Sequence, residues 1–342
     1  MTSVMRQVRL NEPGRFVLRE ESTPAAGPGE VLLRVRRIGV CGTDLHAYRG
    51  RQPFFNYPRV LGHELGVEVV SIGAGVEGFA VGERAALEPY LRCGRCRTCC
   101  SGRSNCCVRL EVLGVHRDGG MQDYIAAPAE LVHRSASLDF EQLALIETLG
   151  IGYHAVERAR LEPGEWVVVV GAGPIGLTVV QFAALAGVRV IVLDVNAARR
   201  EFSRRLGAEF VVDSSGGSAQ TEAAVAAICG DELAHCVFDA TGNLEVMSSS
   251  LRLAGPGGRI VMVGLALGEF RVDDPLFHRR ELSIHSTRNS AGAFPAIIGL
   301  MESGKIDTRP WVTHRLALDA LPSDFETLYT PEIGLVKAMI TL

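Results

Sequence analysis

The sequence predicts an α/β protein with two domains, an irregular, mostly β domain followed by a doubly wound, six-stranded parallel sheet. Its 342 residues are too many for a single ordinary core. Up to about residue 150, short alternating apolar stretches are broken by Gly and Pro turns, which favours β structure. From Glu165 onward, β-branched runs alternate with helices that stop at glycine, which is typical of a parallel sheet.

The individual elements follow from the same patterns. In the first domain the clearest strands are residues 30–35 and 65–72. The second domain should contain the six strands WVVVV, VRVIVLD, AEFVVD, AHCVFDA, RIVMVGL and ELSIHST. The helices between them should end at Gly187, Gly207, Gly230 and Leu253. We therefore place the first domain at 1–150 and the second at 151–289, and expect 290–342 to pack back on the first.

The composition excludes several classes of protein. With 47% hydrophobic residues, 22% charged residues and a net charge of −4, the chain is typical of a globular protein that binds neither nucleic acid nor an anionic membrane. The start of the chain lacks the apolar segment of a secretory signal, so we expect a cytoplasmic protein. Residues 166–180 are too short for a spanning helix, which needs about 20 residues, and we interpret them as a buried strand running into a buried helix.

Two short motifs in the first domain predict a catalytic metal site. The stretch CGTDLH offers the thiol of Cys41, the hydroxyl of Thr43 and the imidazole of His46, and LGHELG offers His63 and Glu64. Each stretch alone has a simpler interpretation, a loop with a buried cysteine or a glycine turn. Together Cys41, His63 and Glu64 form a sulfur, nitrogen and oxygen set suited to Zn²⁺ with one position open for water or substrate.

A second metal site is predicted from the clustering of cysteines. Six of the nine cysteines fall within the stretch CGRCRTCCSGRSNCC. Their spacing suits a closed tetrahedral zinc that holds a surface lobe together, and the preferred ligands are Cys93, Cys96, Cys99 and Cys107. Cys100 and Cys106 each lie beside a preferred ligand and are alternatives to it. The other interpretation of this cluster is a redox-sensing group of thiols.

The second domain opens with a dinucleotide-binding pattern. GAGPIG follows the strand WVVVV and begins a helix, and Asp194 ends the next strand about 20 residues on. The glycines let the backbone approach a pyrophosphate at the helix N-terminus, and Asp194 can accept hydrogen bonds from the ribose. A carboxylate there favours NAD over NADP, although Arg199 leaves NADP open. The predicted cofactor contacts are Gly171, Gly173, Pro174, Ile175, Gly176, Asp194, Arg199, Thr241, Gly264, Leu265 and Arg288.

Weaker candidates lie between these motifs. Glu147 is a carboxylate in an apolar stretch, so it needs a partner such as the metal or a substrate hydroxyl, unless it stands at a solvated helix end. Arg288 follows the sixth strand, at the carboxyl edge of the sheet where ligands bind, but an ordinary surface arginine would look the same. Candidates for a substrate pocket, for which core or surface roles are the alternative, are Phe54, Phe55, His116 and Arg117.

Taken in order over essentially the whole chain, CGTDLH, GHE, the four-cysteine stretch, GAGPIG and Asp194 resemble the zinc-dependent medium-chain alcohol and polyol dehydrogenases. The resemblance implies a GroES-like catalytic domain interrupted by a Rossmann domain, with the active site in the cleft between them. It also implies a dimer or tetramer, with the strand near residues 283–287 as an edge for pairing between subunits. IETLGIGYHAV and HSTRN are similar to stretches of sorbitol dehydrogenases, where the Glu and Arg at these places serve zinc-bound water and substrate. That similarity makes Glu147 and Arg288 active-site candidates.

The chain also resembles one subgroup of this family. QPFFNYPRVLGHE, SGRSNCC, GVHRDGG and FHRRELSIHSTRN are similar to bacterial sugar-acid dehydrogenases of the L-galactonate 5-dehydrogenase type, which implies oxidation of a secondary hydroxyl of an aldonate by NAD. Thr148, where a proline is usual, and His285, where a small residue is common, depart from the pattern. Both departures concern the substrate more than the chemistry.

The resulting hypothesis is a zinc-assisted hydride transfer. Zinc held by Cys41, His63 and a carboxylate lowers the pKa of the substrate hydroxyl, Thr43 accepts its proton, and His46 passes the proton towards solvent. Glu64 is the preferred resting ligand, and Glu147 is a neighbouring or exchanging one. The carboxylate of an aldonate needs a cation, for which Arg288, Arg117 and His116 are candidates. The alternatives are a polyol or threonine dehydrogenase, a catalytically inactive regulator that binds zinc and nucleotide, and a thiol-based redox sensor.

Overall fold

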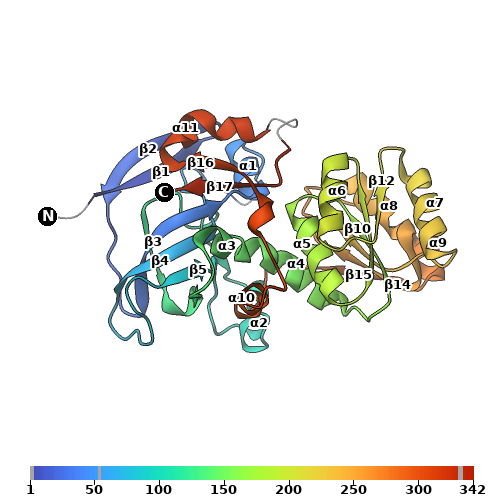
Figure 1. Ribbon diagram of the computed structural model, residues 1–342, viewed down its shortest axis with the longest axis horizontal. Helices are drawn as coiled ribbons and strands as arrows, with labels where there is room; N and C mark the ends of the chain where they lie inside the picture. Colours follow the sequence, from blue (N-terminus) through green and yellow to red (C-terminus); the bar gives the residue numbers. More distant parts are fainter. Residues whose placement is uncertain (1–3, 53–54, 330–333) are drawn as a thin grey trace. The chain divides into compact units, whose positions relative to one another are not determined.

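A computed structural model describes residues 4–52, 55–329 and 334–342 of the chain (Figure 1). The chain forms two compact units. Unit 1 comprises Met1–Glu147 and Ala291–Leu342, and unit 2 comprises Thr148–Ser290. The tail of the chain thus belongs to the same unit as its beginning. In Figure 1 the red strands of the tail lie beside the blue strands from the start of the chain.

The main sheet of unit 1 combines strands from its two segments. Its order is β16 (Val312–Ala317), β17 (Lys337–Thr341), β3 (Glu30–Gly39), β4 (Glu64–Ile72), β5 (Arg84–Leu87) and β9 (Val132–Arg134), with β8 (Tyr124–Pro128) also paired to β3. β17 runs antiparallel to β3, so Met339 lies opposite Gly39. This pairing brings residue 337, at the start of β17, to the end of β3.

Shorter elements surround this sheet. The strands are β1 (Val4–Glu12), β2 (Arg15–Ser22), β6 (Tyr90–Leu91) and β7 (Glu111–Val112). The helices are α1 (Gly42–Tyr48), α2 (Arg97–Cys100), α3 (Phe140–Ala144), α10 (Phe294–Glu302) and α11 (Leu321–Asp324). Leu33, Ile38 and Leu65 from the sheet pack in one apolar core with Phe325 from the tail, and all four are fully buried. Burial of this apolar surface fastens the tail to the first segment.

Unit 2 is a parallel six-stranded sheet with the strand order β12-β11-β10-β13-β14-β15. The strands are β10 (Trp166–Val170), β11 (Arg189–Asp194), β12 (Phe210–Asp213), β13 (Ala234–Asp239), β14 (Ala254–Met262) and β15 (Ser283–Ser286). The helices are α4 (Ile146–Ala159), which begins at the end of unit 1, α5 (Pro174–Leu185), α6 (Ala197–Arg205), α7 (Ser218–Cys229), α8 (Leu244–Ser250) and α9 (Asp274–Arg279). The predicted α/β class and its six-stranded parallel sheet are confirmed.

Glycines end the helices of unit 2 as predicted. Gly187, Gly207 and Gly230 follow α5, α6 and α7 with φ angles of 75°, 108° and 77°. Only glycine adopts this left-handed conformation without a steric penalty, so the chain can leave the helix and enter the next strand. The apolar run 166–180 is divided between β10 and the buried start of α5. Within the described residues, no helix is long and apolar enough to cross a membrane.

The order in which strands are added to the sheet reverses at β10, the first strand of unit 2. β11 and β12 lie on one side of β10, whereas β13, β14 and β15 lie on the other. In open parallel sheets, ligands bind outside the carboxyl ends of the strands at this switch point. The loops that follow β10 and β13 are therefore where a ligand is expected to bind.

Candidate functional site

Cys41 stands at the junction between β3 and α1. β3 ends at Gly39, and Cys41 precedes the first residue of α1 with an extended backbone. The backbone N–H of Cys41 donates a hydrogen bond of 2.9 Å to Oδ2 of Asp44. A carboxylate in the first turn complements the positive end of the helix, and here it also fixes the backbone that carries the thiol. Half-buried Thr43 and exposed His46 follow three residues apart, on one face of α1.

Three predicted zinc ligands gather in unit 1. One ligand atom from each of Cys41, His63 and Glu64 lies within 4.8 Å of the other two. Glu64 begins β4 and lies opposite Gly39 of β3, so the pairing of these strands brings His63 and Glu64 to the residue where Cys41 follows. A thiolate, an imidazole and a carboxylate suit Zn²⁺ and leave a fourth position for water or substrate.

A buried carboxylate lies behind His63. Asp44 and His63 are 1% and 5% exposed, and Oδ1 of Asp44 lies 3.7 Å from Nδ1 of His63. Burial raises the pKa of Asp44. Burial also lowers the pKa of His63, but the charges of Asp44 and Cys41 outweigh burial and raise this pKa well above its ordinary value. Neither Oδ1 of Asp44 nor Nδ1 of His63 has a hydrogen-bond partner among the described residues, so the carboxylate acts on the ring through its charge. The sequence did not predict this role for Asp44.

Glu64 forms an ion pair that the sequence did not predict. Nζ of Lys337, at the start of β17, lies 2.5 Å from Oε1 of Glu64. Both residues are almost fully buried, at 2% and 1% exposed. Burial lowers the pKa of Lys337, but the charges of Glu64 and Cys41 outweigh burial and raise it. Lys337 and Glu64 are thus paired inside the core of unit 1, beside the predicted ligands.

Glu147 is held by a different partner. It is 5% exposed, and its Oε1 accepts a short hydrogen bond from the hydroxyl of Tyr90 in β6. The interpretation of Glu147 as a solvated helix end is therefore wrong. Burial raises the pKa of Glu147. The pKa of Tyr90 is raised well above its ordinary value by burial and by the neighbouring charge of Glu147. Glu147 does not belong to the group formed by Cys41, His63 and Glu64.

The four preferred cysteines of the second metal motif also come together. One sulfur from each of Cys93, Cys96, Cys99 and Cys107 lies within 4.8 Å of the others. A hydrogen bond with Thr98 lowers the pKa of Cys96 to about 5, whereas burial raises the pKa of Cys99 to about 12. Four cysteine sulfurs this close suit a structural zinc, to which all four would bind as thiolates. Cys100 is exposed and, like Cys106, lies outside this group.

The glycine-rich motif forms the turn from β10 to α5. Gly171 has a φ of 92°, and a Cβ on Gly176 would lie 1.8 Å from the carbonyl oxygen of Gly171. Both positions therefore require glycine. A Cβ on Gly173 would meet no atom within 4 Å, so the backbone before Pro174 and Ile175 is open to a ligand. Pro174 begins α5, which presents its N-terminal backbone at this point.

Asp194 lies at the end of β11, beside that turn. It is 7% exposed, and its Oδ2 accepts a hydrogen bond of 2.7 Å from the backbone N–H of Ala172. Its Oδ1 accepts one of 2.7 Å from the backbone N–H of Asn196. Arg199 is exposed at the start of α6. The carboxylate is thus placed by the backbone on both sides, next to the glycine turn.

The other predicted cofactor residues follow neighbouring strands. Thr241 follows β13, and its hydroxyl donates a hydrogen bond of 2.7 Å to Oδ1 of Asp239. Gly264 and Leu265 follow β14, and Leu265 is 73% exposed. Arg288 is exposed beyond the end of β15. Because all these strands are parallel, the residues share the carboxyl edge of the sheet with Gly171 and Asp194.

The weaker substrate candidates are dispersed. Phe54 lies outside the described residues. Phe55 is 8% exposed, and its ring packs against Tyr57 at a centroid distance of 4.8 Å, as a core residue does. His116 is exposed and accepts a hydrogen bond from the backbone of Val112. Nε of Arg117 lies 2.8 Å from Glu111, so its charge is already balanced.

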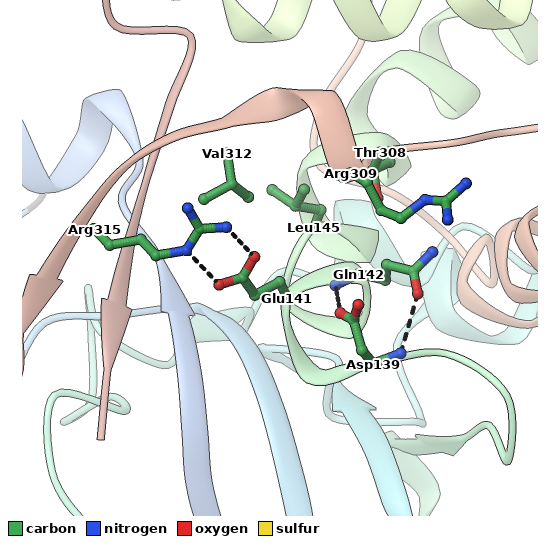
Figure 2. Close-up of a pocket in the computed structure, with 8 residues that line it drawn as sticks. All are labelled: Asp139, Glu141, Gln142, Leu145, Thr308, Arg309, Val312 and Arg315. Carbon is green, nitrogen blue, oxygen red and sulfur yellow. Dashed lines mark hydrogen bonds and ion pairs between the residues drawn. The ribbon is translucent and has the colours of Figure 1, made fainter.

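A small polar hollow lies elsewhere in unit 1. It encloses about 180 Å³ between α3 and the tail and is lined by charged residues, including Glu141 and Arg315. Figure 2 shows the guanidinium of Arg315 bonded through two nitrogens to the Glu141 carboxylate, at 2.8 and 2.7 Å. The hollow contains none of the predicted site residues. Its ion pair instead ties the tail to α3, which leads through Leu145 into the helix that carries Glu147.

Two family models match the chain. The alcohol dehydrogenase GroES-like domain matches residues 27–137, and the zinc-binding dehydrogenase model matches residues 174–303. The first covers Cys41, His63, Glu64 and the four-cysteine lobe. The second begins at the helix that follows the glycine turn. The GroES-like class predicted for the first part of the chain is thereby confirmed.

Individual proteins are similar over nearly the full length. L-galactonate-5-dehydrogenase of Escherichia coli (strain K12) is 39% identical over 341 residues, which cover 99% of both chains. The crystal structure of an alcohol dehydrogenase (rspB) from E. coli CFT073, complexed with NADH, has a TM-score of 0.93 and 31% identity and covers 99% of this chain and 100% of that one. A putative zinc-binding dehydrogenase from Sinorhizobium meliloti 1021, bound to NADP, has a TM-score of 0.92, 31% identity and the same coverage.

Proposed function

Since this chain belongs to the zinc-type medium-chain alcohol dehydrogenase family, we propose that it oxidises a secondary hydroxyl of a sugar acid with NAD. Oxidation of a CH–OH group follows from the family. The observation that carries the proposal is the convergence of Cys41, His63 and Glu64 within 4.8 Å of one another in unit 1. The full-length similarity to a sugar-acid dehydrogenase supports the substrate class.

The residues around the proposed zinc site divide the chemistry. When bound, zinc supplies a Lewis acid that lowers the pKa of the substrate hydroxyl, and NAD accepts the hydride. Thr43 lies two residues after Cys41 at the start of α1 and accepts the hydroxyl proton. His46 lies on the same face of the helix and is exposed, so it can pass the proton to solvent. The carboxylate of Asp44 lies 3.7 Å from Nδ1 of His63, beyond hydrogen-bonding distance, and acts on the imidazole through its charge.

We assign the preference for NAD over NADP to Asp194. Its carboxylate is fixed beside the glycine turn and is positioned to accept hydrogen bonds from the ribose hydroxyls. A 2′-phosphate at that place would be repelled by the carboxylate. Arg199 is exposed nearby on α6, and its charge would favour such a phosphate, which makes NADP the second cofactor to test.

The acid group of the substrate needs a cation. Arg288 is exposed at the carboxyl edge of the sheet in unit 2, where ligands bind, and we assign it to the substrate carboxylate. An Arg288→Gln variant should raise KM for a sugar acid and leave KM for a neutral polyol unchanged. Equal effects on both substrates would remove Arg288 from acid recognition.

Assembly is proposed to use the edge of the sheet in unit 2. β15 ends the strand order, so one of its edges has no neighbour among the described strands. Such an edge can pair with a second copy and form a continuous sheet, which is consistent with a homodimer or homotetramer. Sedimentation of the purified chain measures this directly.

A substrate screen tests the proposal. Purified, zinc-replete protein is mixed with NAD and with sugar acids, polyols or amino-acid alcohols, and formation of reduced nicotinamide is followed by absorbance. Oxidation of sugar acids with kcat/KM well above that for polyols supports the proposal. Oxidation of neutral polyols alone, or of threonine alone, would contradict the assignment to sugar acids. Absence of any oxidation despite NAD binding would indicate a regulator in place of an enzyme.

A further inference from the structure

The pair formed by Lys337 and Glu64 is unusual in its burial. Nζ and Oε1 lie 2.5 Å apart, and the residues are 2% and 1% exposed. Removing two charges from water costs free energy that a single ion pair often does not recover. The stability of unit 1 alone therefore does not explain why an ion pair is buried beside two predicted zinc ligands.

Only one oxygen of the Glu64 carboxylate is engaged. Oε2 is buried and has no hydrogen-bond partner among the described residues. The space beside it is kept free by a glycine, because a Cβ on Gly39 would lie 1.9 Å from this oxygen. A buried carboxylate oxygen without a partner is costly. The geometry thus provides one oxygen bound to an ammonium group and one oxygen available to another cation.

We propose that Lys337 is a positioning residue for the catalytic zinc, which holds Oε1 of Glu64 so that Oε2 is the ligand beside Cys41 and His63. The ammonium group binds Oε1 and so prevents both oxygens from turning to the metal. Glu64 is consequently the resting ligand. Glu147 is not, because Tyr90 holds its Oε1. The inference rests on the proposed function, since it assigns a task within the same zinc site.

A positioning role for Lys337 differs from a purely structural role in one measurable respect. A structural pair would stabilise unit 1 without regard to the metal. A positioning residue acts through Glu64, so its effect on metal binding must vanish when Glu64 can no longer ligate as a carboxylate. This dependence is measurable without alcohol or NAD, and it is therefore independent of which substrate the enzyme oxidises.

The test compares Lys337→Met, Lys337→Arg, Glu64→Gln and the double variant Lys337→Met/Glu64→Gln in the full chain. The readouts are zinc per chain, the affinity of the catalytic site for zinc, and the visible absorption of protein with Co²⁺ in that site. Lys337→Met should weaken metal binding by about 10- to 100-fold, as loss of a partner behind a ligand commonly does, and should change the Co²⁺ spectrum. Lys337→Arg, which keeps the charge, should retain most of the affinity. The zinc of the four-cysteine lobe serves as the internal control.

The double variant decides between the two roles. In the Glu64→Gln background, Lys337→Met should cause no further loss of metal and no spectral change. Unchanged affinity and spectrum in Lys337→Met, or an equal loss in both backgrounds, would overturn the proposal. If Lys337→Met does not fold, Gly39→Ala gives the second measurement, because its Cβ meets only Glu64 atoms among its three nearest neighbours. Loss of catalytic metal in Gly39→Ala supports the assigned orientation of Oε2, and full retention contradicts it.

Discussion

The carboxylate of Asp194 accepts a hydrogen bond of 2.7 Å from the backbone N–H of Ala172, which lies inside the glycine-rich turn. This bond joins the ends of two adjacent strands, β10 and β11, next to the switch point of the sheet between β10 and β13. The residue proposed to bind the ribose and the turn proposed to bind the pyrophosphate are therefore parts of one rigid arrangement. Cofactor affinity and cofactor choice should depend on it together.

Asp194→Ser should narrow the preference for NAD over NADP. Loss of charged hydrogen-bond acceptors for the ribose should raise KM for NAD by about tenfold or more, while KM for NADP should fall because the repulsion of its phosphate is removed. Steady-state kinetics with both cofactors measure the ratio. Asp213→Ser is a matched control, because Asp213 ends the neighbouring strand opposite Asp194 and pairs with Arg200. An unchanged ratio in Asp194→Ser would show that Asp194 does not contact the ribose.

Much of the fold was predictable because its signals are local. Glycines with positive φ end the helices at Gly187, Gly207 and Gly230, and the β-branched runs between them form the parallel strands. The strand order could not be obtained in this way, because pairing such as that of β17 with β3 joins residues from opposite ends of the chain. Periodicity describes an element, and burial against distant elements decides where it lies.

The residues of the site likewise divide into those with a local signal in the sequence and those that depend on contacts between distant residues. Cys41, His63 and Glu64 were recognisable from residue type, and the structure brings them together. Lys337 lies 273 residues from Glu64 in sequence, and a single lysine in the tail carries no local signal for a buried pair. Tyr90 likewise lies 57 residues from Glu147. Asp44 did have a signal, its place inside CGTDLH, but an acidic residue in a first helical turn is ordinarily explained by the helix itself.

The four-cysteine lobe should respond to substitution of its ligands and not of their neighbours. Cys96→Ser should remove roughly one zinc per chain and expose residues 93–107 to proteolysis, since α2 has only four residues and needs the metal for order. Cys100→Ser should keep the zinc, because Cys100 is exposed and outside the cluster. Metal analysis and limited proteolysis check both variants. Equal zinc loss in the two would show that the ligand set is different.

Tyr90→Phe should destabilise unit 1 and alter the surroundings of Glu147. The substitution removes the hydroxyl and leaves a buried carboxylate oxygen without its donor, which costs about 1–3 kcal/mol. Urea unfolding of the metal-free protein measures the change. Tyr153→Phe is a suitable comparison, because its ring keeps the contact with the ring of Phe182, at a centroid distance of 5.3 Å. This substitution should change the stability less. A neutral Tyr90→Phe substitution would contradict the importance of this bond.

The stability of unit 2 should depend on pH through Glu165. Burial raises the pKa of this carboxyl, but hydrogen bonds from Arg259 and from the backbone of Glu162 outweigh burial and lower the pKa below 4.5. Because the pKa is lower in the folded state, the contribution to stability is complete above pH of about 4.5 and is lost as the pH falls through the depressed value. Urea unfolding of the wild type and Glu165→Gln should therefore differ at pH 7 and converge in acid. A constant difference would exclude this linkage.

Cys41 is proposed to hold a zinc ion that alcohol oxidation requires, and Cys41→Ser removes this ligand. The variant should lose roughly one zinc per chain, keep the zinc of the four-cysteine lobe and lose NAD-dependent oxidation. NAD binding, followed by fluorescence, should persist because the cofactor residues lie in unit 2. Metal content and oxidation rate are measured on the same sample. Oxidation at the wild-type rate in protein that has lost this zinc would show that the reaction does not require it.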